Sequence, residues 1–211
     1  MAEEDWSRLV ETLKQKGYLE TERIERSILS VDRAKFVDQA REEAYQDVPL
    51  PIGEGQTVSA PHMVAMMTEA IRPEPGDNVL EIGAGSGFQA AVVSEVVKEV
   101  HTVEIKEELV EKAKDNLKDY GNVQVYHKDG SDGLPQQAPF DKILFTASTP
   151  KVPEKIVEQL KEGGRLVVPL EEGFRQDLKV YRKEKGGIVE LENRGAVRFV
   201  PMKGGVRKDQ K

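Results

Sequence analysis

The stretch "NVLEIGAGSG", residues 78–87, decides the fold class. Its apolar run ends in a glycine turn of the form G-x-G-x-G, made by Gly83, Gly85 and Gly87, and the apolar run "FQAAVVSEVV" follows directly. A short buried strand that turns through glycines into a helix is typical of a ligand-binding α/β sheet, because glycines let the backbone turn tightly and approach a ligand. The dinucleotide fingerprint expects another glycine where this chain has Phe88, so that version of the motif fits poorly.

Downstream of the glycine turn, strand-like and helix-like runs alternate. We expect strands at "EVHTVEI", "VQVYHKDG", "FDKILFTAS" and "RLVVPL", and helices at "KEELVEKAKDNLKDYG" and "VPEKIVEQLKEGG", each stopped by glycine. Alternation of this kind requires right-handed crossovers, so it predicts an α/β fold with an open, doubly wound, mostly parallel sheet covered on both faces. The tail "DLKVYRKEKGGIVELENRGAVRFV" predicts an antiparallel hairpin at the sheet edge.

The segment upstream of the glycine turn reads differently. Apolar periodicity predicts two amphipathic helices, over residues 6–17 and 22–31, whereas residues 32–55 read as mostly loop with room for a short helix. Pro61 suits the first turn of a third helix that runs to about Ile71. We expect one domain over residues 1–211, divided into an N-terminal helical and loop subregion (1–72), a ligand-binding core (73–170) and C-terminal antiparallel strands (171–211).

Composition excludes several classes of function. The chain is 38% hydrophobic and 33% charged, as in soluble globular proteins, and no apolar run approaches the roughly 20 residues of a membrane span. The first residues are acidic and amphipathic, unlike a secretory leader, so we expect a cytoplasmic protein. A net charge of −7 argues against nucleic acid as a partner. The absence of cysteine removes disulfides, thiolate nucleophiles and thiolate metal sites.

Acidic residues end the two strands that follow the glycine turn. Glu104 closes "HTVEI", and Asp129 and Gly130 close "VQVYHKDG". A carboxylate at Glu104 can accept hydrogen bonds from both hydroxyls of a ribose, and Asp129 can meet an adenine amino group. Taken alone, each position reads as a solvated strand end or a turn. Their shared place at the carboxyl ends of successive parallel strands favours a ligand site.

Over residues 74–170 this arrangement resembles the class I S-adenosylmethionine-dependent methyltransferases. The resemblance implies that S-adenosylmethionine is the cofactor, that the glycine turn contacts its methionine part, that Glu104 binds its ribose and that Asp129 approaches its adenine. It implies the following cofactor-binding residues and no metal: Thr57, Val58, His62, Glu81, Gly83, Ala84, Gly85, Gly87, Glu104, Ile105, Asp129, Gly130 and Thr146.

The methyl acceptor is suggested by the segment "PLPIGEGQTVSAPHMVA". This block, together with "EIGAGSGFQAAVVSE", "FDKILFTASTPKVPEKIVEQLKEGGRLVVPL" and "VRFVP", resembles the protein-L-isoaspartate O-methyltransferases over residues 49–201. That family methylates the free α-carboxylate of L-isoaspartyl residues in aged proteins, after which the ester closes to a succinimide and part of it returns to L-aspartate. The resemblance implies damaged proteins as substrates, and we expect a monomer that binds neither nucleic acid nor membrane.

Such a reaction needs positioning more than acid–base chemistry. A carboxylate with a pKa of about 3.9 is already ionised at neutral pH, so it attacks without a general base. By resemblance, Ser59 is the active-site serine that holds the substrate carboxylate by one hydrogen bond, while Ala60 and His62 line the substrate cleft. The helix that begins near Pro61 could add backbone donors and the positive end of its dipole.

Other interpretations of the same residues stay open. Ser59 is also a good N-cap for the following helix, His62 could satisfy a nearby backbone group, and the three methionines 63, 66 and 67 fit core packing. The chain could methylate another acceptor, or bind the cofactor without transferring methyl groups. The tail "VPMKGGVRKDQK" lacks polar residues that some relatives use to close over the cofactor. Its basic residues Lys203, Arg207 and Lys208 either steer an anionic substrate or form a solvated charge run.

Overall fold

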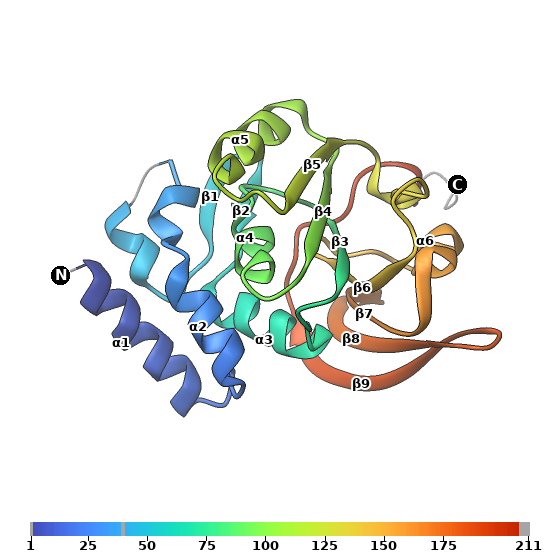
Figure 1. Cartoon of the computed structure of the whole chain (residues 1–211), viewed down its shortest axis with the longest axis horizontal. Helices are drawn as coiled ribbons and strands as arrows, with labels where there is room; N and C mark the ends of the chain where they lie inside the picture. Colours follow the sequence, from blue (N-terminus) through green and yellow to red (C-terminus); the bar gives the residue numbers. More distant parts are fainter. Residues whose placement is uncertain (1, 39–40, 207–211) are drawn as a thin grey trace.

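A computed structural model describes residues 2–38 and 41–206 of the chain and shows one large sheet with helices on both faces (Figure 1). The sheet has seven strands in the order β5-β4-β3-β6-β7-β8-β9. The strands are β3 (Asn78–Ile82), β4 (Glu99–Glu104), β5 (Val123–His127), β6 (Phe140–Phe145), β7 (Leu160–Glu172), β8 (Arg175–Glu184) and β9 (Gly187–Val197). The five strands from β3 to β7 run parallel, and β8 and β9 add the antiparallel edge. The predicted open α/β sheet is therefore confirmed.

Helices cover the two faces of the sheet unequally. One face carries most of them: α1 (Ala2–Gln15), α2 (Glu22–Ser30), α3 (Pro61–Ile71), α4 (Phe88–Ser94) and α5 (Glu107–Leu117). The other face carries α6 (Glu154–Gln159) and the chain beyond β9. The short helices η1 (Arg33–Phe36), η2 (Arg41–Tyr45) and η3 (Gly130–Asp132) lie in the connections. Within the described ranges, no helix is both long enough and apolar enough to cross a membrane.

Two expected elements differ from the structure. The helix that we expected to run to the glycines at 163 and 164 is only α6, which ends at Gln159. The backbone becomes extended at Leu160, which is buried and pairs with Phe140, so both glycines lie inside β7. The segment expected as loop, residues 32–55, contains η1, η2 and the strand β1 (Leu50–Gly53), which pairs antiparallel with β2 (Gln56–Val58) directly after the segment.

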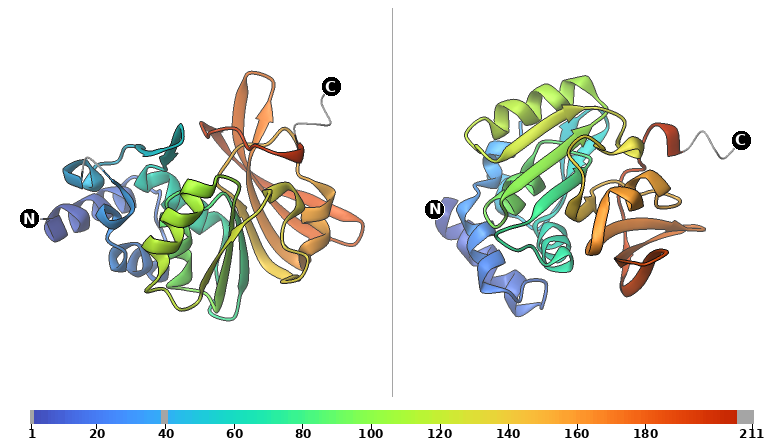
Figure 2. Two further views of the ribbon diagram at one scale, coloured as in Figure 1. Left: turned by 90° about the horizontal axis from the view of Figure 1, so that it is seen from above. Right: turned by 45° about the vertical axis from the view of Figure 1, so that its right-hand side comes forward.

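The chain after β9 crosses back over the carboxyl ends of the parallel strands (Figure 2). We call residues 198–206 the C-terminal strap. Ser148, at the end of β6, accepts the Met202 N–H (2.8 Å) and donates its own N–H to Val200 (3.0 Å). Further along, the Gly205 N–H donates to Asp129 Oδ2 (2.8 Å). The strap thus closes over the sheet edge, although the tail lacks the polar residues that some relatives use to close over the cofactor. Arg207 and Lys208 lie outside the described residues.

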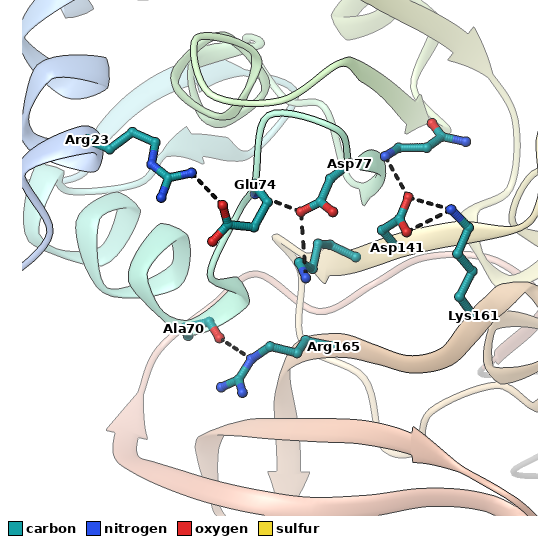
Figure 3. A network of polar contacts seen from close by, with 9 residues as sticks. Arg23, Ala70, Glu74, Asp77, Asp141, Lys161 and Arg165 are labelled. Carbon is teal, nitrogen blue, oxygen red and sulfur yellow. Dashed lines mark hydrogen bonds and ion pairs between the residues drawn. The ribbon is translucent and has the colours of Figure 1, made fainter.

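The opposite, amino edge of the sheet is tied to the helices by ion pairs (Figure 3). Arg23 of α2 pairs with Glu74 (2.6 Å), and the Glu74 N–H donates to Asp77 just before β3 (2.7 Å). Asp141 at the start of β6 pairs with Lys161 of β7 at 2.7 Å. These contacts hold the amino ends of the strands together, so the other edge can remain open for a ligand.

Candidate active site

A cavity of about 890 Å³ opens along the carboxyl ends of β3, β4 and β6. The residues that line it come from the β1–β2 hairpin, the start of α3, the glycine turn and the strap. They include most of the site residues predicted from the sequence: Thr57, Val58, Ser59, Ala60, His62, Gly83, Ala84, Gly85, Glu104, Ile105, Gly130 and Thr146. Segments separated by more than a hundred residues therefore share one cavity.

Glycine is required in the turn for two different reasons. Gly83, Gly85 and Gly87 all have positive φ values, of 105°, 55° and 93°. A Cβ on Gly83 would lie 2.4 Å from Thr146 Oγ1, and one on Gly87 would lie 2.7 Å from Leu117. Gly87 does not line the cavity, and its approach to Leu117 accounts for the glycine by packing; its contact with the cofactor stays a prediction. Thr146 holds the turn from the other side, because its hydroxyl donates to the carbonyls of Ile82 (3.1 Å) and Gly83.

Ser86 fits a bound cofactor. Ser86 lines the cavity, and its hydroxyl oxygen is buried and has no hydrogen-bond partner among the described residues. A buried hydroxyl without a partner costs about 1–3 kcal/mol, which a polar ligand in the cavity would recover. Sequence reasoning missed Ser86 because a serine between glycines reads as part of the turn.

Glu104 lies at the end of β4, facing the glycine turn. Its carboxylate accepts three backbone N–H bonds, from Gly85 (3.0 Å), Ile105 (2.9 Å) and Lys106 (3.0 Å). A carboxylate has about four lone-pair sites, so one remains for a ligand hydroxyl. The backbone bonds also fix the orientation of the carboxylate, which prepares it for one defined hydrogen bond.

The other two predicted carboxylates do not line the cavity. Asp129 accepts from the backbone and hydroxyl of Ser131 and from Gly205 of the strap. Glu81 belongs to β3, and its side chain is buried. The Thr102 hydroxyl donates to its Oε2, and its Oε1 has no partner among the described residues. Burial raises the pKa of Glu81 to about 8. Both residues lie behind the cavity lining, and direct contact of either with the cofactor stays a prediction.

The loop before α3 presents Ser59 to the cavity. Ala60 is the N-cap of α3, and no side chain caps the helix from that position, so the N-cap interpretation of Ser59 is wrong. Within the described ranges, Ser59 Oγ has no hydrogen-bond partner, and the side chain is only partly buried. Its hydroxyl is therefore available to a ligand.

Asp47 accepts the hydrogen bond from the backbone N–H at the start of α3 that we expected to be available to the substrate. Pro61 has no N–H, and the His62 N–H donates to Asp47 Oδ1 (2.9 Å), so the expectation of free backbone donors at these positions is wrong. The His62 ring also meets Asp47, with Nδ1 to Oδ1 at 2.8 Å, and packs against Tyr18 at 5.3 Å between ring centroids. This pair fixes the imidazole against the cavity wall.

Arg33 holds the same loop from behind. Its side chain is 0% exposed, and its guanidinium donates to the carbonyls of Ala44 (2.9 Å), Gln46 (3.2 Å), Val48 (2.8 Å) and Ser59 (3.1 Å). Burial lowers its pKa to about 10, opposed by the charge of Asp47, so it stays a cation at neutral pH. No sequence signal identified Arg33, because its partners are main-chain carbonyls from two separate segments, residues 44–48 and Ser59.

Among the described residues, no group of three or more His, Asp or Glu side chains is placed to hold a metal ion. A glycine turn, a strand-end glutamate and a cavity along the carboxyl edge of an open sheet are the features of the class I S-adenosylmethionine-dependent methyltransferase fold. A solved protein-L-isoaspartate O-methyltransferase has the same fold, with a TM-score of 0.87 and 32% identity over 95% of this chain and 67% of that chain.

Three further comparisons identify the family within this class. A protein-L-isoaspartate O-methyltransferase from Plasmodium falciparum, solved with S-adenosyl-L-homocysteine, has a TM-score of 0.82 and 28% identity over 93% of this chain and 97% of that chain. The protein-L-isoaspartate O-methyltransferase of Methanopyrus kandleri is 48% identical over 204 residues, which cover 93% of this chain and 90% of the relative. The family model of protein-L-isoaspartate(D-aspartate) O-methyltransferases matches residues 4–207, and the chain belongs to this family.

Proposed function

We propose that this protein transfers a methyl group from S-adenosylmethionine to the free α-carboxylate of L-isoaspartyl residues in damaged proteins, which leads through a succinimide to partial repair. Family membership supports the reaction class, and the S-adenosyl-L-homocysteine complex of the Plasmodium relative supports the cofactor. The observation that carries the proposal is the unpartnered Ser59 hydroxyl, which lines the same cavity as the glycine turn.

The cofactor, when bound, supplies a methyl group on a positively charged sulfur. Gly83 to Gly85, the Ser86 hydroxyl and the last lone pair of Glu104 are the groups that would hold it. Ser59 donates one hydrogen bond to the substrate carboxylate and leaves the other oxygen free to attack, and Ala60 lines the cavity beside it. Holding acceptor and donor in line is worth up to roughly 7–11 kcal/mol.

Ser59 itself needs to be fixed for this role. Arg33 binds its carbonyl, and Asp47 fixes the neighbouring His62. Because the hydroxyl is a neutral donor, it orients the carboxylate without neutralising the charge that makes it a nucleophile. The carboxylate oxygen gains the methyl group as the carbon–sulfur bond breaks, and the product is a neutral ester.

We further propose that the chain works as one methyltransferase domain, as a monomer, in the cytoplasm, on proteins rather than on nucleic acid or membranes. The net charge of −7 supports a protein rather than a phosphate backbone as the partner. Light scattering on a sizing column would test the monomer: a mass near 23.6 kDa is expected, and twice that mass would contradict it.

The decisive experiment uses one peptide in two forms, with L-isoaspartate or L-aspartate at a single position, and labelled S-adenosylmethionine. We expect a base-labile methyl ester on the isoaspartyl form alone. If neither form is methylated while calorimetry shows cofactor binding, the acceptor is wrong.

Ser59→Ala tests the mechanism. Loss of a hydrogen bond to a charged group costs about 1.5–3 kcal/mol, so we expect kcat/KM to fall roughly 10- to 100-fold. The affinity for S-adenosylhomocysteine should stay within about twofold of the parent. An unchanged kcat/KM would show that the serine does not orient the acceptor.

A further inference from the structure

Arg198 occupies a fixed place on the rim of the cavity. It directly follows β9, whose last residue, Val197, pairs with Gln176 of β8. The Gln176 side chain then binds both main-chain groups of Phe199, accepting the N–H (2.6 Å) and donating to the carbonyl (3.1 Å). The backbone on each side of Arg198 is therefore held, while its side chain is exposed and lines the cavity.

The guanidinium of Arg198 has no partner among the described residues. Every other arginine whose side chain is described meets a carboxylate or a main-chain carbonyl: Arg8, Arg23, Arg26, Arg33, Arg72, Arg165, Arg175, Arg182 and Arg194. In an acidic chain with a net charge of −7, an arginine side chain that meets no carboxylate is unusual. Its position at the cavity makes it available to a ligand.

The other charges that line the cavity are mostly satisfied. Lys106 pairs with Glu54 (2.9 Å), and the Glu104 carboxylate accepts three backbone donors. His62 is paired with Asp47. Apart from Arg198, only Lys203 on the same strap lines the cavity as a charged group without a partner in the described part of the chain. The rim of the cavity thus presents unpaired positive charge, which complements an anionic ligand.

The reacting carboxylate is a poor match for this cation. A strong ion pair would stabilise the carboxylate more than the transition state, in which its charge passes to the cofactor sulfur, and so would slow the transfer. Ser59 already supplies a neutral donor for that group. A second carboxylate, on a side chain next to the isoaspartyl residue, could pair with Arg198 and strengthen substrate binding without slowing methyl transfer.

We propose that Arg198 is a specificity-determining residue that selects isoaspartyl segments with an acidic side chain adjacent to the isoaspartyl residue. The inference rests on the proposed function and refines its substrate class. Besides the reacting carboxylate, the cofactor also brings a carboxylate into the cavity, so the test must separate the cofactor from the neighbouring side chain as the partner of Arg198.

The experiment measures binding of labelled isoaspartyl peptides to protein saturated with S-adenosylhomocysteine, by fluorescence anisotropy. Three peptides differ only in the residue after isoaspartate, which is Glu, Gln or Lys. For a single exposed ion pair we expect the Glu peptide to bind about two- to fivefold more tightly than the Gln peptide, with the Lys peptide weakest. The difference should shrink at about 1 M salt because exposed charges are then screened.

Two variants test the residue, and one controls for net charge. Arg198→Gln should remove the ranking, and Arg198→Glu should reverse it. Lys185→Glu, like Arg198→Glu, replaces a positive charge by a negative one, but at an exposed lysine in the turn of the β8–β9 hairpin. It should keep the parental ranking of the three peptides. S-adenosylhomocysteine affinity, measured by calorimetry, should be unchanged in Arg198→Gln.

Each other outcome overturns the inference. The same ranking in the parent and Arg198→Glu, or no ranking or no peptide binding in the parent, would show that Arg198 does not select the substrate. A loss of S-adenosylhomocysteine affinity in Arg198→Gln would assign the cation to the cofactor carboxylate. Methyl transfer to the same peptides separates the two proposals: transfer without ranking removes only the inference, whereas ranking without transfer removes only the proposed activity.

Discussion

At the scale of single residues, Arg33 shows how a buried cation can organise an active-site loop. We predict that Arg33→Met lowers the free energy of unfolding by about 3 kcal/mol or more, because four main-chain carbonyls lose a charged donor inside the protein. Arg33→Lys keeps the charge but cannot reach all four carbonyls, so it should fall in between. Urea unfolding at equilibrium measures the differences.

The matched control is Arg26→Met. Arg26 pairs with Glu22 on the surface of α2, where both side chains are 75% exposed, so we expect a change below about 0.5 kcal/mol. Equal losses in the Arg26 and Arg33 variants would contradict the role of Arg33.

Glu81 predicts a dependence of stability on pH. Its pKa is raised by burial to about 8 in the folded protein, from 4.5 in the unfolded chain, so the folded state binds a proton that the unfolded state releases. The protonated side chain is therefore favourable below about pH 4.5, and this contribution is lost as the pH rises toward 8.

Glu81→Gln removes this titration and keeps an oxygen for the Thr102 hydroxyl. We predict that the variant gains stability relative to the parent between about pH 5 and pH 9, by at most roughly 5 kcal/mol. Urea unfolding at a series of pH values measures the difference, with the exposed Glu107→Gln as control. A difference between parent and Glu81→Gln that does not change with pH would show that Glu81 is ionised in the folded state.

The site residues that sequence could predict are those carried by a local motif. Ser59, Glu104 and the glycines lie in short patterns, each next to a strand or helix end that the sequence itself predicts. Arg33 and Gln176 bind main-chain groups, and Arg198 is available because no described residue pairs with it. Neither property can be predicted from a sequence pattern. For the same reason, sequence could not show that the carboxylate of Asp129 faces the strap.

At the scale of elements, the strap is the part whose position decides access to the cavity. Gln176→Ala removes its bonds to both main-chain groups of Phe199 and to the Ser148 hydroxyl. We predict a local destabilisation on the order of 2 kcal/mol, faster amide hydrogen exchange over residues 198–206, and a higher KM for cofactor and peptide with a smaller change in kcat.

Gln176→Glu is the graded comparison. It keeps an acceptor for the Phe199 N–H but loses both donors, so the exchange rates should lie between those of the parent and Gln176→Ala. If exchange over the strap is unchanged in the alanine variant, Gln176 does not hold the strap.

Among the elements, periodicity predicted those with strong local signals. The parallel strands from β3 to β6, α3 from Pro61 to Ile71 and the final hairpin lie where the sequence places them, and β7 includes the predicted strand but begins earlier, at Leu160. The end of α6 was wrong because Leu160 is recruited into the sheet by its partner Phe140, a tertiary contact that outweighs the helical pattern of "KIVEQLKEGG". The β1–β2 hairpin was missed because its strands are short and contain proline and glycine.

At the scale of the whole molecule, the cavity joins parts that the sequence keeps apart. The main core runs from Trp6 in α1 through the sheet to Val180 in β8 and to Phe199 in the strap. A smaller core lies under α6 and includes Met202 and Val206 of the strap. Because the strap contributes to both cores, and the N-terminal helices to the larger one, we expect the three subregions proposed from the sequence to fold as one domain.

Trp6 makes this expectation measurable, since it is the single tryptophan of the chain and its fluorescence reports on how α1 packs against α2 and α4. It is buried, donates from Nε1 to the Ile28 carbonyl (3.1 Å) and packs edge-on against Phe88 of α4 at 6.3 Å. We predict that tryptophan fluorescence and far-ultraviolet circular dichroism, which reports on the whole fold, give the same urea midpoint. S-adenosylhomocysteine at about 100 times its Kd should raise the unfolding free energy measured by each of the two signals by about 2.7 kcal/mol. A fluorescence transition that precedes the dichroism transition, or that ignores the ligand, would instead define residues 1–72 as a separate unit.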